Sequence, residues 1–256
     1  MVDMTDCTIR AELRDMEYDN NIDILFAVEA GSRVWGMSSN DSDYDVRFVF
    51  KRPREEYLKL NKLKDVIVKT IKNRDYVGFD IYKTCGLINS SNPSIIEWLQ
   101  SDIVYYGKQP EELIKVSKNF NPLALYHHYL SMGKQNYLKY IKSGEKITYK
   151  KYLYAMRGII NSFWVKEYNS LPLINFPNIL AQIFSNEQKT ISNEIINRLF
   201  EIIALKKQGL EKDIIENEKN FDLFIENYLK TSEPPKPRKN LKLVDDLNNY
   251  ILKIVN

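Results

Sequence analysis

The sequence of residues 31–50 reads GSRVWGMSSNDSDYDVRFVF, and this stretch decides the fold. A β-rich run at 22–28 ends just before it, and its last residues, 44–50, form a second β-rich run. Because side chains alternate between the two faces of a strand, Asp43 and Asp45 point to the same side. The stretch therefore predicts two strands joined by a short, turn-rich connection, with two carboxylates converging where the second strand begins.

The paired carboxylates of Asp43 and Asp45 predict a site for divalent cations. Two adjacent negative charges in a partly dehydrated cleft are unfavourable unless a cation neutralises them, and hard oxygen ligands select Mg²⁺ or Mn²⁺. Two such ions about 4 Å apart would stabilise the attacking and leaving oxygens of an in-line displacement at phosphorus. Gly31 and Ser32 fit this chemistry, because glycine lets a triphosphate approach the backbone and the serine hydroxyl can bond its terminal oxygens.

The rest of the chain predicts an α+β protein with two domains. Further β-like runs at 66–71, 76–82 and 103–106 complete a small mixed sheet. After it, apolar residues recur at helical spacing in five segments: 122–141, 148–166, 188–206, 217–230 and 241–254. We therefore expect a catalytic domain over 1–108 and a helical bundle over 109–256. Its proline-rich segment, 232–239, predicts a linker before a last helix.

Composition favours a reducing compartment. The chain has two cysteines, with 44% apolar and 28% charged residues, which argues against a disulfide-rich secreted protein and against a disordered chain. The first residues lack the bases and the apolar run of a signal peptide, and prolines and amides interrupt the uncharged stretch 170–186. We therefore expect a cytoplasmic protein without a transmembrane helix.

Charge is divided unevenly along the chain. Residues 1–110 hold 15 Lys and Arg against 18 Asp and Glu, a balance of −3, whereas residues 111–256 hold 22 against 16, a balance of +6. A basic second half suits a polyanion or nucleotide phosphates, although an ordinary lysine-rich solvated surface would give the same balance.

The stretch 31–50 resembles the motif of the polymerase-beta-type nucleotidyltransferase superfamily, in which Gly-Ser is followed after a gap by two aspartates that alternate with hydrophobic residues. It is similar to one branch in particular, the predicted nucleotidyltransferases associated with RNA ligases. The similarity covers roughly residues 22–165 and includes three further segments and one tryptophan: 77–83, 91–101, 151–157 and Trp164. That branch usually has a proline after the arginine of its helical motif, where this chain has Gly158.

The superfamily implies a third metal-binding carboxylate on a later strand. We predict that Asp80 supplies it, because Asp80 lies within the apolar run 76–82, where an unpaired charge is hard to explain structurally. Asp41 and Asp75 are the alternatives. Both lie in turn-like sequence, where a carboxylate more commonly caps local amides.

Basic residues near these aspartates are candidates for binding the phosphates. Arg33 directly follows Gly-Ser, Arg47 is in phase with Asp43 and Asp45 on their strand, and Lys83 follows Asp80 by three residues. Arg47 either orients the two carboxylates through its forked guanidinium group or contacts the substrate.

A polar stripe on the predicted helix 148–166 is a further candidate. Its residues recur at spacings of four and three, and such a stripe is usually a solvated face. The resemblance implies instead that Lys150, Tyr154 and Arg157 face the nucleotide, with Arg157 reaching the triphosphate and Tyr154 available to stack on a base.

The resemblance thus implies an enzyme, a metal-dependent nucleotidyltransferase whose substrate, ATP or another nucleoside triphosphate, lies between the two domains. An acceptor hydroxyl would attack the α-phosphate and expel pyrophosphate, with Asp43, Asp45 and Asp80 holding two Mg²⁺ or Mn²⁺ ions. The association with RNA ligases and the basic second half favour RNA, such as a tRNA end, as acceptor. The alternatives are a protein hydroxyl, as in toxin-antitoxin relatives, and a non-catalytic RNA-binding protein on the same fold.

Overall fold

The computed structural model describes residues 4–61, 63–144, 146–186, 191–238 and 242–256. The chain divides into two compact units, and both are discontinuous in sequence. Unit 1 comprises Met1–Val34, Asp43–Phe120 and Lys239–Asn256, and unit 2 comprises Trp35–Ser42 and Asn121–Arg238. The predicted domain boundary after residue 108 falls within unit 1, and as a functional division it stays a prediction.

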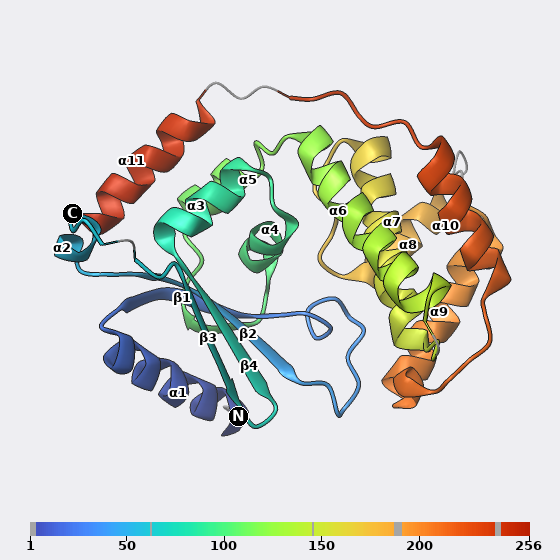
Figure 1. Cartoon of the computed structure of the whole chain (residues 1–256), viewed down its shortest axis with the longest axis horizontal. Helices are drawn as coiled ribbons and strands as arrows, with labels where there is room; N and C mark the ends of the chain where they lie inside the picture. Colours follow the sequence, from blue (N-terminus) through green and yellow to red (C-terminus); the bar gives the residue numbers. More distant parts are fainter. Residues whose placement is uncertain (1–3, 62, 145, 187–190, 239–241) are drawn as a thin grey trace. The chain divides into compact units, whose positions relative to one another are not determined.

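Unit 1 contains a five-stranded mixed sheet, as the sequence predicts (Figure 1). The strands lie in the order β3-β4-β2-β1-β5, with β1 antiparallel to β2 and β5, β3 antiparallel to β4, and β2 parallel to β4. Their bounds are β1 Asp23–Ala30, β2 Tyr44–Lys51, β3 Val66–Ile71, β4 Arg74–Asp80 and β5 Val104–Gly107. The parallel pairing of β2 with β4 is the feature that positions the site.

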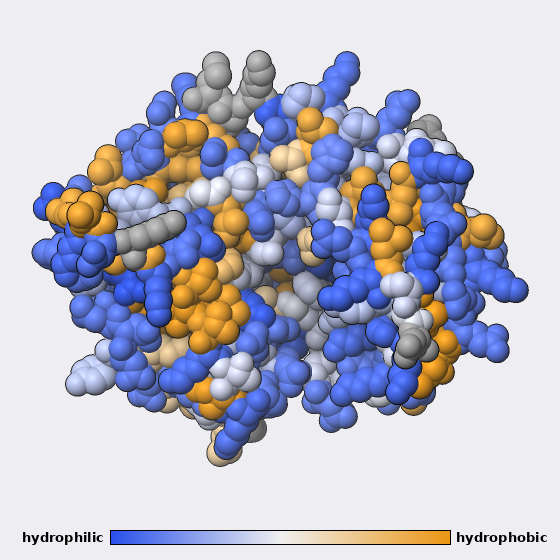
Figure 2. Space-filling view, viewed as in Figure 1, coloured by the Kyte–Doolittle hydropathy of each residue, from blue (hydrophilic) through white to orange (hydrophobic). Residues whose placement is uncertain are grey.

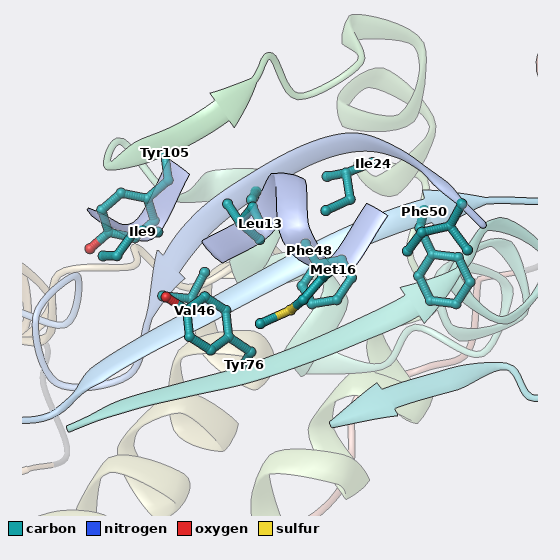
Figure 3. Packing of buried hydrophobic residues seen from close by; sticks show 11 residues of the cluster. Ile9, Leu13, Met16, Ile24, Val46, Phe48, Phe50, Tyr76 and Tyr105 are labelled. Carbon is teal, nitrogen blue, oxygen red and sulfur yellow. The ribbon is translucent and has the colours of Figure 1, made fainter. Parts of the chain in front are cut away.

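Helix α1 (Met4–Asn20) covers one face of this sheet. Its buried residues Ile9, Leu13 and Met16 are spaced by four and three, so they form one apolar stripe. Figure 3 shows this stripe directed at side chains of the sheet, among them Val46 and Tyr76, in one hydrophobic core.

Four short helices and one longer helix complete unit 1. They are α2 (Arg54–Tyr57), α3 (Ile81–Asn89), α4 (Pro93–Gln100), α5 (Glu111–Ser117) and α11 (Leu243–Val255). The predicted strand 76–82 was wrong at its end, because the chain turns into α3 after Asp80, whose carboxylate accepts a hydrogen bond from the amide of Tyr82.

The last helix, α11, packs against α3 and α5 (Figure 1). Lys253 on α11 forms an ion pair with Glu112 on α5, and the ammonium group of Lys51 donates to the carbonyl oxygen of Ile254 at 3.0 Å. The C-terminal helix therefore belongs to the unit that contains the sheet.

Unit 2 is helical, in agreement with the periodicity of the sequence. Its elements are α6 (Pro122–Tyr137), the π-helical turn η1 (Leu138–Lys142), α7 (Tyr149–Tyr168), α8 (Phe176–Ser185), α9 (Asn193–Lys207), η2 (Leu210–Lys212) and α10 (Lys219–Thr231). Of the predicted helices and linker, residues 188–190, 239 and 241 lie outside the described part of the chain.

Helices α6 and α7 pack closely because each carries a glycine at the contact. A Cβ atom at Gly158 would lie 2.4 Å from the backbone nitrogen of Gly133, and one at Gly133 would lie 2.8 Å from the backbone nitrogen of Ile159. Gly158 therefore has a packing role at the position where the resembling branch has proline.

The surface mixes polar and apolar residues. Figure 2 shows mostly hydrophilic residues on the face in view, with apolar residues in separate patches. Within the described ranges, no helix combines the length and the apolar character that crossing a membrane requires.

Candidate active site

Asp43 and Asp45 lie where β2 begins, as the sequence predicts. Asp43 directly precedes the strand and is exposed, whereas Asp45 is partly buried and pairs with Ala30, the last residue of β1. Since the strands are antiparallel here, the end of β1 and the start of β2 meet at one edge of the sheet. The Gly31-Ser32 turn and the two carboxylates therefore lie together.

Gly31 makes room for the carboxylate of Asp45. A Cβ atom at Gly31 would lie 2.0 Å from Oδ2 of Asp45, and the backbone of Gly31 has φ +67°, which favours glycine. The sequence interpretation gave this glycine the task of admitting a triphosphate. In the structure its nearest neighbour is the aspartate itself, and Ser32 beside it is buried.

Arg47 joins carboxylates from two neighbouring strands. Its Nη2 lies 2.8 Å from Oδ1 of Asp45 and 3.1 Å from Oδ2 of Asp75, and its Nη1 donates to the carbonyl oxygen of Asp75 at 2.7 Å. The parallel register of β2 and β4 explains this, because it pairs Asp45 with Asp75. Of the two roles left open for Arg47, this geometry supports orientation of the carboxylates.

Asp80 lies at the other end of β4. It is five residues beyond Asp75 and pairs with Phe50, and at the ordinary rise of a strand this separates the two aspartates by roughly 16 Å. Its Oδ2 accepts from the hydroxyl of Tyr57 and its Oδ1 from the amide of Tyr82, both at 2.8 Å. The structure therefore does not bring Asp80 to Asp43 and Asp45, and the residue caps α3 instead.

The burial of Asp80 has a measurable electrostatic consequence. The side chain is 3% exposed, and this desolvation raises the pKa of Asp80, although the amide of Tyr82 and the hydroxyl of Tyr57 oppose the shift. The lone charge in an apolar strand, which suggested a metal ligand, is explained by the helix that begins directly after it.

The structure separates the predicted basic residues Arg33 and Lys83. Arg33 donates from Nε to the carbonyl oxygen of Asp43 at 3.2 Å and stacks its guanidinium group 3.8 Å from the centre of the Tyr44 ring. Lys83 lies on α3, beyond Asp80, and pairs with Asp65 at 3.0 Å. Arg33 therefore lies beside the carboxylate pair, and Lys83 does not.

Sequence reasoning missed Glu29, which is fully buried next to Asp45. Its Oε1 accepts from the backbone amide of Asp45 at 2.8 Å, and its Oε2 accepts from the hydroxyl of Tyr105 at 2.5 Å. Burial raises the pKa of Glu29 to about 7, although both hydrogen bonds lower it. A signal was present, because Glu29 is an acid that directly follows the apolar residues 24–28, and a charge in an apolar strand is the criterion that selected Asp80.

The polar stripe on α7 is only partly solvated, because Lys150 and Tyr154 are half-buried and Arg157 is buried. Arg157 is 5% exposed, and its guanidinium group lies 3.7 Å from the centre of the Trp35 ring. Tyr154 meets the same ring edge-on at 6.0 Å, and Lys150 lies 3.5 Å from a carboxylate oxygen of Glu211. All of these residues belong to unit 2, and their binding of a nucleotide stays a prediction.

The donors at the start of β2 and β4 suit a divalent cation. Among the residues that the structure describes, no three His, Cys, Asp or Glu side chains form a metal-binding cluster. Asp45 and Asp75 nevertheless present hard carboxylate oxygens to one positive group, Arg47, and Asp43 adds a third, exposed carboxylate nearby in the chain. Carboxylate oxygens are the ligands that Mg²⁺ and Mn²⁺ prefer.

The mixed sheet, the Gly-Ser turn and the strand-borne aspartates together define a nucleotidyltransferase fold of the polymerase-beta type. The chain belongs to the RNA repair pathway DNA polymerase beta family, whose model matches residues 6–253. The predicted family resemblance is thus confirmed. The match is longer than the predicted 22–165, and it includes most of α1 and of α11.

Two curated relatives are similar in sequence. One is the uncharacterized protein YcgL of Bacillus subtilis (strain 168), 32% identical over 251 residues, which are 95% of this chain and 94% of the relative. The other is the uncharacterized protein MJ0002 of Methanocaldococcus jannaschii, 31% identical over 115 residues, which are 43% of this chain and 47% of the relative.

Among solved structures, a nucleotidyltransferase-like protein from Exiguobacterium sibiricum is 10% identical, with a TM-score of 0.27 and coverage of 96% of this chain and 88% of that one. The family assignment therefore rests on the sequence match, and the sheet described above agrees with it.

Proposed function

We propose that the protein transfers a nucleoside monophosphate from a nucleoside triphosphate to a hydroxyl group of RNA, using divalent cations held by Asp43, Asp45 and Asp75. The observation that carries this proposal is the parallel register of β2 and β4, which pairs Asp45 with Asp75 under the shared guanidinium group of Arg47. Asp75 takes the place of Asp80 in this assignment, because Asp80 lies at the other end of β4 and is engaged in capping a helix.

The reaction is a displacement at the α-phosphorus. The acceptor hydroxyl oxygen loses its proton to the surrounding water and forms a bond to that phosphorus, the bond to the oxygen that bridges to the β-phosphorus breaks, and pyrophosphate leaves. Bound Mg²⁺ or Mn²⁺ would neutralise the charge on the phosphates. In this proposal Arg47 fixes the carboxylates of Asp45 and Asp75, while Ser32 and Arg33, beside Gly31, bind terminal phosphate oxygens.

RNA as the acceptor has two supports. The family description refers to an RNA repair pathway, and residues 111–256 carry a balance of +6 that suits a polyanion. The donor is ATP or another nucleoside triphosphate. If RNA is bound, affinity should fall steeply with added salt, because each neutralised phosphate releases counterions.

A labelling experiment tests the proposal. The protein is incubated with Mg²⁺ and each labelled triphosphate in turn, together with total RNA and total protein from its source cell. Label in RNA supports the proposal, label in protein supports the modification of a protein hydroxyl, and label in neither pool contradicts transferase activity.

Matched variants show whether the carboxylates carry the activity. Asp43→Asn and Asp45→Asn, shown to be folded by circular dichroism, are expected to lose the labelling. The control is Asp23→Asn, which changes an exposed aspartate at the other end of β1. Labelling by the two site variants at the rate of the parent would exclude this site.

The predicted nucleotide contact of Arg157 needs its own test, because the residue is buried against Trp35. Arg157→Ala should destabilise the protein by about 1–2 kcal/mol through the lost cation–π contact and packing. If Arg157 also binds the triphosphate, the affinity of the folded variant should fall about tenfold to a hundredfold. Unchanged affinity would leave Arg157 with a structural role only.

A further inference from the structure

Glu29 and Asp45 approach each other from opposite faces of the sheet. Glu29 on β1 pairs with Val46 on β2, and paired residues of antiparallel strands direct their side chains to the same face. Val46 belongs to the core beneath α1, which Figure 3 shows. Asp45 precedes Val46 and therefore faces the other side, where Arg47 binds it.

The carboxylate of Glu29 contacts the backbone of Asp45 and not its side chain. Its Oε1 accepts from the backbone amide of Asp45, while its Oε2 accepts from the hydroxyl of Tyr105 on β5. The carbonyl oxygen of Glu29 accepts from the hydroxyl of Ser101 at 2.7 Å, and its amide donates to the carbonyl oxygen of Ile103 at 2.9 Å. The buried carboxylate of Glu29 therefore connects the backbone at the start of β2 to the Tyr105 side chain on β5.

We propose that Glu29 is a positioning residue for the metal-binding carboxylate of Asp45, an inference that rests on the proposed function. A fully buried carboxylate with both oxygens bonded has one orientation, so it fixes the peptide group from which the Asp45 side chain projects. That side chain has little freedom of its own, since Oδ2 lies against Gly31 and Oδ1 against Arg47. Loss of Glu29 would leave the amide of Asp45 without this acceptor and release the strand end.

The chain offers a matched control in Glu17. Its Oε1 accepts from the backbone amide of Ile24 at 2.7 Å, and its Oε2 accepts from the hydroxyl of Tyr106 on β5 at 3.3 Å. Glu17 therefore makes the same two kinds of hydrogen bond, to an amide of the β1–β2 pair and to a β5 tyrosine. It does so near the start of β1, whereas Glu29 lies near its end.

The test measures the binding of Mn²⁺ to the full-length protein directly, by the electron paramagnetic resonance signal of the free ion. Glu29→Ala is expected to raise the dissociation constant of Mn²⁺ about tenfold to a hundredfold, the range found when groups that orient metal ligands are removed. Glu29→Gln keeps an oxygen that can accept from the amide and should restore most of the affinity. Glu17→Ala should leave it within about twofold of the parent.

If Glu29→Ala does not fold, Tyr105→Phe and its control Tyr106→Phe decide the question. Tyr105→Phe removes only the hydroxyl that holds Glu29, and it should weaken Mn²⁺ binding severalfold while Tyr106→Phe does not. If Glu29→Ala folds and binds Mn²⁺ as tightly as the parent, the inference is overturned. If Glu29→Ala does not fold, parent-like Mn²⁺ binding by Tyr105→Phe overturns it. Asp45→Asn separates the two proposals, because parent-like Mn²⁺ binding by that variant contradicts the proposed function itself.

Discussion

The two ends of strand β4 carry one aspartate each, and they differ in almost every physical respect. Asp75 lies beside Asp45, its side chain is 39% exposed, and a guanidinium group joins it to a neighbouring strand. Asp80 is 3% exposed, and both of its oxygens accept hydrogen bonds from its own surroundings. An aspartate that is accessible and shares a guanidinium group with a second carboxylate suits a metal ligand, whereas one that is buried and fully bonded suits a structural cap.

The comparison teaches that strand register, and not the apolar character of the surrounding sequence, decides which carboxylate of β4 lies beside Asp45. Asp75 and Asp80 lie at opposite ends of one strand, and the residues that they pair with on the neighbouring strand show which of them is close to Asp45. For β4 that partner is β2, and the pairing is parallel.

The largest expected effect is on Asp75. Asp75→Ala should lower the turnover of labelled triphosphate at least about a hundredfold, because it removes one of three proposed cation ligands at the reacting phosphate. Its melting temperature should stay near that of the parent, since the side chain is partly exposed. Turnover by Asp75→Ala at the parent rate would contradict the proposal that Asp75 is a cation ligand.

The next effect concerns Glu12 on α1, which supports the Asp75 end of β4 from the core side. Its carboxylate binds Arg74 through two hydrogen bonds and also accepts from the hydroxyl of Tyr76. Glu12→Gln should destabilise the protein by about 2 kcal/mol at neutral pH, measured by urea denaturation, because the charged partner of Arg74 is lost.

The effect of Glu12→Gln should also depend on pH. Burial alone would raise the pKa of Glu12, but hydrogen bonds from Arg74 and Tyr76 lower it below 4.5. A lowered pKa in the folded state contributes stability above the unfolded value of 4.5, and this contribution is lost as the pH falls through the folded pKa. The difference between parent and variant should therefore shrink in acid. A constant difference across that range would contradict the assignment.

For Asp80 we expect the reverse of the result for Asp75, a loss of stability without a loss of turnover. Asp80→Ala should reduce the free energy of unfolding by about 1–2 kcal/mol, as loss of a helix cap does, and the folded variant should turn over triphosphate at the parent rate. A turnover loss as large as that of Asp75→Ala would reinstate Asp80 as a ligand.

The smallest effect is expected at Tyr57, which donates its hydroxyl hydrogen to Asp80. Tyr57→Phe should cost about 1 kcal/mol of stability, the ordinary value of one hydrogen bond, and leave activity unchanged. Thermal unfolding and the labelling assay measure the two quantities on the same sample. A loss of activity without a loss of stability would place the Asp80 end in the reaction.

The sequence predicts the strands and the paired aspartates because their signals are local. Apolar runs mark β1 and β2, and the alternation of a strand places Asp45 and Arg47 on one face. The partner of Asp45 on the neighbouring strand is a non-local property, so Asp75 could not be separated from Asp80 by spacing. The same limit hid Glu29, because its carboxylate accepts a hydrogen bond from the backbone amide of Asp45 on another strand.

The helical half shows a different limit. Periodicity predicts α7, but it cannot tell a buried polar stripe from a solvated one, and Arg157 is buried because Trp35, distant in sequence, stacks on it. Likewise the proline-rich linker correctly predicts a last helix, and nothing in its composition indicates that this helix packs on α3 and α5.

The return of α11 to unit 1 imposes an order on biosynthesis. A ribosome delivers the sheet, α3 and α5 first, and only after the whole of unit 2 does it release the helix that packs on α3 and α5. Until Leu247, Tyr250 and Ile251 emerge and are buried, the nascent unit exposes the apolar surface that they will cover. A chain that stops before α11 would therefore contain every proposed metal ligand and still be exposed to aggregation and proteolysis.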